Sequence, residues 1–176
     1  LDQGQDLGPG VYRVLNYGGV LTNNGLDIGT FVSPDETPTR PLPDFVVQTV
    51  IPGQVNLVNT SGVSLNYWDG SAVPDKNDST IQGGVGTWVA GASSSSDWTD
   101  VGGAINGAWA DSQFAIFLGA GDTVTTSNAL GAVRASGMQF GVDGYVLQGD
   151  AIELVGTASA PGDSVIRVGD GTRDSA

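Results

Sequence analysis

Short runs of apolar and β-branched residues alternate with turn residues along the whole chain. Runs rich in Val, Ile, Thr, Phe and Tyr and bounded by Gly, Asn, Asp or Pro are typical of β-strands. No stretch of about a dozen residues carries apolar side chains at helical spacing without an internal Gly or Pro, so we expect no helices. The pattern predicts strands at residues 11–17, 26–31, 45–51, 55–59, 64–68, 114–117, 123–127, 133–135, 138–142, 145–148, 152–155 and 165–168. The fold class is therefore all-β.

The second half of the chain carries the more regular pattern. From Phe114 onward the strands follow at short, nearly regular intervals and are separated by glycines. Hairpins in a sandwich produce such spacing, and so does a β-solenoid whose coils turn at Gly or Asn. A solenoid would point apolar columns inward, with Ile116, Val124, Val133, Met138, Phe140, Val146, Ile152, Leu154, Val165 and Ile166 as the candidates. The intervals drift, so spacing alone leaves both architectures open.

Two segments interrupt the strands and divide the chain. Residues 34–43 contain four prolines, which cannot pair inside a sheet, so we expect a loop. Residues 71–111 are rich in Trp, Gly and Ser and poor in strand formers, and they include a serine run at 93–96. We interpret them as a long insert anchored by its tryptophans. The expected division is one continuous domain, with coils at 1–70, the insert at 71–111 and further coils at 112–176.

The composition removes several classes of function. The net charge of −13 disfavours nucleic acid and anionic membrane surfaces as partners, and no membrane insertion is expected. The chain has no Cys and no His, which excludes thiolate chemistry, Ser-His nucleophiles and nearly all zinc sites. Lys76 is the single lysine and sits in a predicted loop. We expect no cofactor, no metal and no catalytic residues.

Acidic side chains provide two weaker candidates for chemistry. Asp143, Asp150 and Glu153 would be the paired carboxylates of a polysaccharide-degrading β-helix, but each lies within three residues of a turn glycine, where acids are common turn residues. The loop at residues 75–79 begins like a calcium loop. It lacks the Gly at the sixth position and the Glu at the twelfth, so a solvated loop is favoured over a specific calcium site.

Aromatic side chains provide the one candidate ligand surface. Tyr67, Trp68, Trp88, Trp98 and Trp109 are the residues that would form a sugar-binding platform. The alternative, which we favour, is that these side chains cover a core or a strand edge.

The order of motifs in the chain resembles the passenger regions of bacterial autotransporters, those with the passenger-associated transport repeat, of the autotransporter-associated β-strand type. The matching motifs are LNYWDG (65–70), GTW (86–88), WTD (98–100), NGAWA (106–110), FAIF (114–117), GDTVT (121–125), GAVRASGMQF (131–140) and DGYVLQG (143–149). The segments GVYRVLNY (10–17) and NGL (24–26) resemble the coils that precede this repeat. The repeat itself spans about residues 119–156, and its core residues are Thr123, Val124, Gly137, Met138, Phe140, Gly144 and Tyr145.

The resemblance implies a right-handed, single-stranded parallel β-helix that crosses the outer membrane unfolded, by type V secretion, and folds at the cell surface. Members of the family are mostly large adhesins and virulence factors, and the repeat is associated with secretion and not with catalysis. The implied partner is a C-terminal translocator barrel that anchors the passenger to the outer membrane. No such membrane strands occur in these residues, so we expect an internal fragment.

Three functional hypotheses follow. The first is a structural β-helical segment that supports secretion and folding of an extracellular adhesin or virulence factor. The second is an adhesive module that binds a host glycan or matrix protein through Trp68, Trp88, Trp98 and Trp109. The third is a β-helical polysaccharide-degrading enzyme that works with the acids named above.

Overall fold

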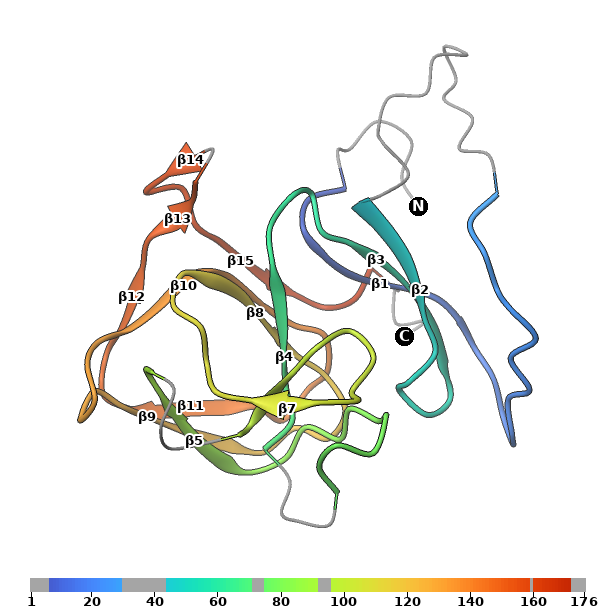
Figure 1. The fold of residues 1–176 in the computed structure, drawn as a ribbon, viewed down its shortest axis with the longest axis horizontal. Coiled ribbons are helices and arrows are strands. Elements are labelled where there is room, and N and C mark those ends of the chain that lie inside the picture. Colours follow the sequence, from blue (N-terminus) through green and yellow to red (C-terminus); the bar gives the residue numbers. More distant parts are fainter. Residues whose placement is uncertain (1–6, 30–43, 71–74, 92–95, 159, 172–176) are drawn as a thin grey trace.

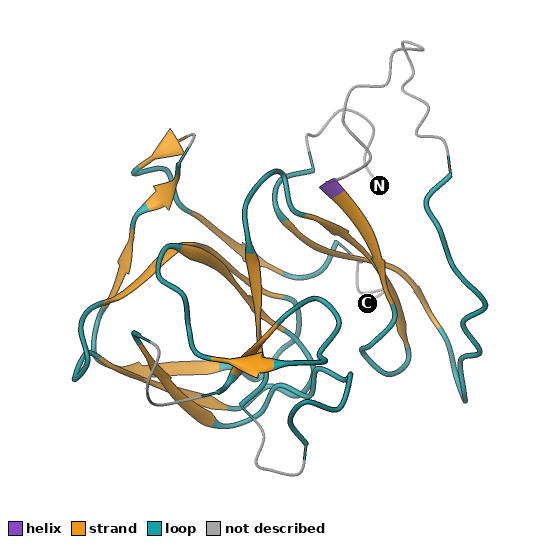
Figure 2. Cartoon of the chain, viewed as in Figure 1, coloured by secondary structure: helices purple, strands orange, loops and turns teal. Residues whose placement is uncertain are grey.

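The computed structural model describes residues 7–29, 44–70, 75–91, 96–158 and 160–171. Apart from one helical residue, Asp44, these residues are strand or loop (Figure 2), which confirms the all-β prediction. None of them forms a helix long and apolar enough to cross a membrane. The strands are β1 (Gly10–Asn16), β2 (Phe45–Gln48), β3 (Gln54–Asn59), β4 (Leu65–Trp68), β5 (Gly86–Val89), β6 (Trp98–Thr99), β7 (Asn106–Gly107), β8 (Gln113–Phe117), β9 (Thr123–Ser127), β10 (Val133–Phe140), β11 (Val146–Gly149), β12 (Ile152–Leu154), β13 (Gly156–Thr157), β14 (Ala160–Pro161) and β15 (Val165–Val168).

Three sheets organise the described residues, together with the small pair β13–β14. The N-terminal sheet has the order β1-β3-β2. The long sheet has the order β12-β10-β8-β4-β6-β7, and β15 also pairs with β10. The short sheet has the order β11-β9-β5. Figure 1 shows the N-terminal sheet on the right, beside the other two.

From β4 onward the chain alternates between the long and the short sheet. It runs from β4 to β5, then from β8 to β9, and then from β10 to β11, before it returns to the long sheet at β12. The pairs β4–β8, β8–β10 and β10–β12 are all parallel, as are β5–β9 and β9–β11. We call these strands, with β15, the parallel stack. The strands β6 and β7 are antiparallel to it and make the long sheet mixed.

The N-terminal strands differ from the expected coils. The pairs β1–β3 and β2–β3 are antiparallel, so residues 10–59 do not form parallel coils. The connection between β2 and β3 is a short turn, closed by the Gln54 N–H donating to the Ile51 carbonyl (3.2 Å), with Gly53 at φ +80°. Such a turn joins only antiparallel neighbours, since parallel strands need a crossover of about a dozen residues.

The long sheet is the middle layer, and its two faces bury two apolar clusters. Along β8, Phe114 and Ile116 join Val11 and Val58 of the N-terminal sheet in one cluster. The alternate residues of β8 face the short sheet and join a second cluster that holds all four tryptophans. This explains why residues 114–118 are apolar without alternation: a strand covered on both faces has no solvent side.

Gln139 fastens the N-terminal sheet to the parallel stack. The side chain lies on β10 and is fully buried. It makes the hydrogen bonds with the β1 backbone that a neighbouring strand would make. Its Oε1 accepts from the Val11 N–H (2.8 Å), and its Nε2 donates to the Val11 carbonyl (2.8 Å) and the Gly169 carbonyl (2.8 Å). Beside it Arg13 forms an ion pair with Asp170. The buried Gln139 side-chain amide therefore joins β1, β10 and the loop after β15, which are far apart in the chain.

Several local predictions need correction. Leu26 begins a loop and not a strand, because the Asn23 carboxamide oxygen accepts from the Gly25 and Leu26 N–H groups (2.9 and 3.0 Å) and fixes a turn; residues 30–31 lie outside the described range. The two strands expected at 133–142 are one strand, β10, whose register shifts between Ala135 and Gly137. The Pro-rich loop at 34–43 and most of the serine run at 93–96 fall outside the described residues.

Candidate functional site

The tryptophans of the chain form one contiguous cluster beneath the short sheet. We call Trp68, Trp88, Trp98 and Trp109 the tryptophan cluster. Ring centroids lie 4.5 Å apart for Trp98 and Trp109, 4.8 Å for Trp88 and Trp109, 4.9 Å for Trp88 and Trp98, and 5.2 Å for Trp68 and Trp98. Most of these pairs meet edge to face, an arrangement favoured by the ring quadrupoles. Trp88, Trp98 and Trp109 belong to the predicted insert, so the insert contributes to the core.

The cluster is closed to solvent. The four side chains are at most 2% exposed, and Tyr67 is fully buried in the apolar cluster on the opposite face of the long sheet. Two indole N–H groups have partners, since Trp68 donates to the Gly84 carbonyl (2.8 Å) and Trp109 to the Arg134 carbonyl (3.0 Å). A ligand would reach the indole faces only after the packing opened. In this structure the aromatic side chains are core and not a platform.

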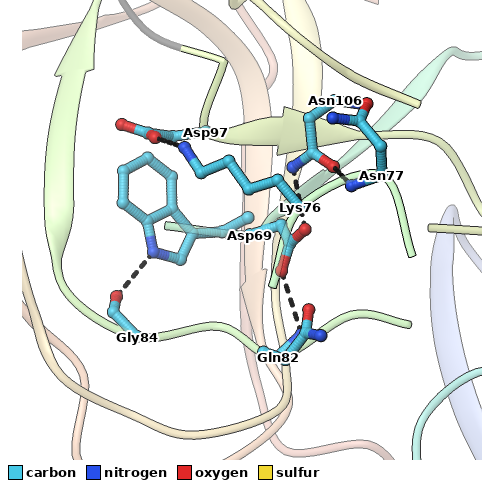
Figure 3. A network of polar contacts seen from close by, with 8 residues as sticks. Asp69, Lys76, Asn77, Gln82, Gly84, Asp97 and Asn106 are labelled. Atoms are coloured by element: carbon cyan, nitrogen blue, oxygen red, sulfur yellow. Dashed lines mark hydrogen bonds and ion pairs between the residues drawn. The ribbon is translucent and has the colours of Figure 1, made fainter. Parts of the chain in front are cut away.

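A polar network with a buried carboxylate, Asp69, at its centre lies beside the cluster (Figure 3). The Asp69 carboxylate accepts from the Gln82 N–H (3.0 Å) and from the Asn106 side-chain amide (2.8 Å), while its own N–H donates to the Asp97 carbonyl (2.7 Å). Asn106 also exchanges two 2.8 Å bonds with Asn77, each backbone N–H donating to the other's carboxamide oxygen. One carboxylate thus ties the end of β4 to the loop before β5 and to β7.

Electrostatics around Asp69 follow from this burial. Desolvation raises the pKa of the Asp69 carboxyl, with a further contribution from nearby Asp78; the bonds from Asn106 and Gln82 and the charge of Lys76 oppose the shift. The single lysine forms an ion pair with Asp97 at the edge of the network, with both side chains 12% exposed. Lys76 is therefore a structural cation that fastens the loop. Asp69 itself stands in the motif LNYWDG, but nothing in the sequence marked it as the centre of a network.

Of the acids singled out from the sequence, Asp143 and Asp150 lie at turns and Glu153 lies on β12. Asp143, Asp150 and Glu153 are all exposed. The Asp150 carboxylate accepts from the Asn128 N–H (2.8 Å), and Glu153 forms an ion pair with Arg134 (2.8 Å). Asp143 lines a hollow of about 330 Å³ whose other polar residues include the paired Arg13 and Asp170. Among the described residues no three Asp or Glu side chains gather as metal ligands, and this holds for the loop at 75–79.

The residues of the predicted repeat core divide between packing and turning. Val124 and Met138 are buried in the cluster that holds the tryptophans, Phe140 and Tyr145 pack against it, and Thr123 lies half-buried on β9. Gly144 is an exposed turn residue at φ +89°, and a Cβ at Gly137 would lie 2.7 Å from the Phe114 ring. The Tyr145 hydroxyl donates to the Leu118 carbonyl (2.6 Å), and burial, reinforced by the charge of Asp69, raises its pKa. Most residues of the predicted repeat core therefore pack in the core between the two sheets, and Gly144 forms a turn that connects successive strands of the stack.

Comparison with known proteins gives one close similarity. No protein-family model matches the chain, and no solved structure matches it. The protein named Adhesin BmaC autotransporter, from Brucella suis biovar 1 (strain 1330), is 46% identical over 173 residues, which cover 96% of this chain. The chain spans only 5% of the length of that relative. Along nearly its whole length the chain is therefore similar to one short stretch of an autotransporter adhesin.

Proposed function

We propose that this chain is a structural segment of the passenger of a cell-surface autotransporter adhesin. The observation that carries the proposal is the 46% identity over 96% of the chain. We further propose that the parallel stack is a right-handed parallel β-helix with the long and short sheets as its faces and one coil per pair β4/β5, β8/β9 and β10/β11. The alternation of the chain between the two sheets supports it. Right-handed connection is the rule for parallel strands.

The stack suits a chain that folds after it leaves the cell. Each coil contacts mainly its neighbours, so folding can start locally and propagate strand by strand as the chain emerges. A folded coil outside the membrane disfavours backward sliding and so biases export without ATP. The absence of cysteine means that no premature disulfide can lock the chain on its way through an oxidising compartment. In this proposal a C-terminal translocator domain of the full-length protein holds the passenger at the outer membrane, and the segment has no catalytic role.

Gly121 provides a test that targets stacking alone. Its Cα lies against the turn of the next coil, so an added Cβ would overlap the Asp143 carbonyl oxygen and approach Gly144 C to 2.7 Å. The substitution Gly121→Val in the full-length protein should therefore disrupt the junction between two coils and reduce surface display. Gly107→Ala is the matched control, because a Cβ at Gly107 meets nothing within 4 Å.

Surface display is measured by antibody binding to intact cells, normalised to total protein. We expect reduced display for Gly121→Val and for deletion of residues 121–149, and unchanged display for Gly107→Ala. Normal display of a Gly121→Val protein whose segment has become protease-sensitive would contradict the role in secretion.

The adhesin name of the relative supports a second candidate, direct contact with a host glycan or matrix protein. Because the tryptophans are buried, the contact would use another surface. The outer face of the short sheet fits a neutral partner, since β5, β9 and β11 contain no charged residue in a chain of net charge −13. On this face Thr87, Thr125 and Gln148 occupy neighbouring register positions.

The two surfaces can be told apart with matched variants in a binding assay on glycans and matrix proteins. Thr125→Glu places a charge on the outer face and should abolish binding, whereas Trp98→Phe changes only a buried ring and should preserve it. Loss of binding in Trp98→Phe with the fold intact, or no binding by the parent protein, would count against an adhesive outer face.

A further inference from the structure

The core of the parallel stack is uncovered at one end. The register places Ile166 and Val168 of β15 on Met138 and Phe140, and Leu154 of β12 on Ala135. Met138 and Ala135 are buried members of the core cluster, and Phe140 packs against it. The residues above them share their inward direction, since paired residues of parallel strands lie on the same face.

Despite that inward direction, these last residues are open to solvent. The exposed fraction is 41% for Leu154, 55% for Ile166 and 81% for Val168. On the short sheet, Val146 of β11 is 53% exposed for a different reason, because it pairs with Thr123 on the outer face, while Leu147, the partner of buried Val124, points inward. The predictions that Leu154 and Ile166 would be core residues therefore fail here for a physical reason: their faces point inward, but no further layer lies over them. Exposed apolar residues gathered at one end indicate a surface that another element covers.

The other end of the long sheet is closed. The strand β6 pairs antiparallel with β4, with Trp98 opposite Trp68, and β7 pairs with β6 in turn. Trp98 is 1% exposed and seals the core beside Trp68 and Trp88. We call β6 and β7 the capping hairpin. It turns the edge of β4 away from any further parallel strand, so a parallel stack can grow past β12 and β15 but not past β4.

We propose that the end formed by β11, β12 and β15 is a docking surface for the polypeptide that follows residue 176 in the full-length protein. That polypeptide adds the next parallel strands and buries Leu154, Ile166 and Val168, so this segment is the capped start of a longer stack that extends toward the C-terminus. The inference rests on the proposed function. It continues the parallel ladder already present between β8, β10 and β15.

A second copy of the segment fits this surface less well. Two copies that meet through the same surface are related by a twofold axis. That axis would place β15 antiparallel to its counterpart, whereas all the pairings of β8, β10, β12 and β15 are parallel. The relative, of which this chain spans 5%, has ample chain to supply further coils.

Single-cysteine labelling tests the proposal, because the natural segment has no cysteine. Val168→Cys reports the open end, and Ile105→Cys reports the capping hairpin, where the side chain is 70% exposed. Both variants are made in the full-length protein, and their reaction rates with a maleimide are measured on intact cells and in native lysate, with denatured protein for normalisation. We expect Val168→Cys to react at least about tenfold more slowly than Ile105→Cys, since a buried thiol reacts only on local opening.

Equal rates at the two positions would overturn the proposal. Protection of position 168 that disappears when expression is lowered would identify a second copy as the occupant and would also overturn it. Leu154→Cys guards against a local effect of the Val168 substitution, and it should be protected as well. Failure of the proposed function gives a different result: no position reacts on intact cells, although the comparison in lysate still reports whether the end is covered.

Discussion

Trp98 links the insert to the core, and its removal should destabilise the whole segment. Trp98 lies in β6, inside the segment 71–111 that the sequence predicted to be a loop-rich insert. Its ring centroid is 4.5 Å from that of Trp109, 4.9 Å from Trp88, 5.2 Å from Trp68 and 5.7 Å from Phe117. The substitution Trp98→Ala removes a side chain that is 1% exposed and leaves a cavity among these rings.

The expected loss in the free energy of unfolding is about 3–5 kcal/mol, the range for truncating a buried Trp to Ala. That is a large part of the roughly 5–15 kcal/mol by which a domain is stable. Trp98→Phe should cost less, on the order of 1–2 kcal/mol, because it keeps a ring in place, leaves a smaller cavity and removes a buried N–H that has no acceptor. The contrast between the two variants isolates the packing contribution.

Urea unfolding followed by far-UV circular dichroism measures these differences without relying on tryptophan fluorescence. Val20→Ala is the control for an apolar truncation without packing, since Val20 is 96% exposed, and its unfolding midpoint should not move. A Trp98→Ala loss below about 1 kcal/mol would refute the reasoning, because a residue in a peripheral insert costs little when truncated. It would mean that β6 is not part of the cooperative core.

Gln139→Leu should reduce the free energy of unfolding by about 2–4 kcal/mol in the same urea assay, because two β1 backbone groups lose their buried partner, whereas Gln148→Leu on the exposed face should change it little. Asp69→Asn should alter the pH dependence of stability. Burial raises the pKa of the Asp69 carboxyl above its ordinary value of 3.8. The contribution of this carboxyl to the free energy of unfolding is therefore full below pH 3.8 and is lost as the pH rises through the raised pKa. Over that window the parent should lose stability relative to Asp69→Asn, and a stability difference between the two that stays constant with pH would contradict this. Cysteines at Thr125 and Gln148, which are register partners, should form a disulfide on oxidation, whereas cysteines at Thr123 and Gln148, two residues out of register, should not.

Local strand positions were readable from the sequence because they depend on local chemistry. The segments 114–117 and 123–127 match β8 and β9 closely, since β-branched and aromatic runs bounded by glycine favour strands in any context. The motif resemblance also led to the kind of protein in which the similar stretch occurs. Trp98 and Trp109, which the favoured interpretation placed over a core or a strand edge, lie inside the core.

Pairing and the polar centres could not be read in the same way, because they depend on distant residues. The strand β5 was missed because its few strand formers stand among glycines at positions 83, 84, 86 and 91, and its position comes from pairing with β9. Gln139 looked like any polar strand residue until the N-terminal sheet supplied the Val11 backbone as its partner. Asp69 likewise acquires its role from Asn106, which lies 37 positions later in the chain.

The central claim is that the segment belongs to a passenger displayed outside the cell. The most direct test is labelling of Val20→Cys in the full-length protein on intact cells with a membrane-impermeant maleimide, because Val20 is 96% exposed and the natural segment has no cysteine. The account predicts that intact cells label to the same extent as lysed cells. Labelling that appears only after lysis would place the segment inside the cell and contradict the account.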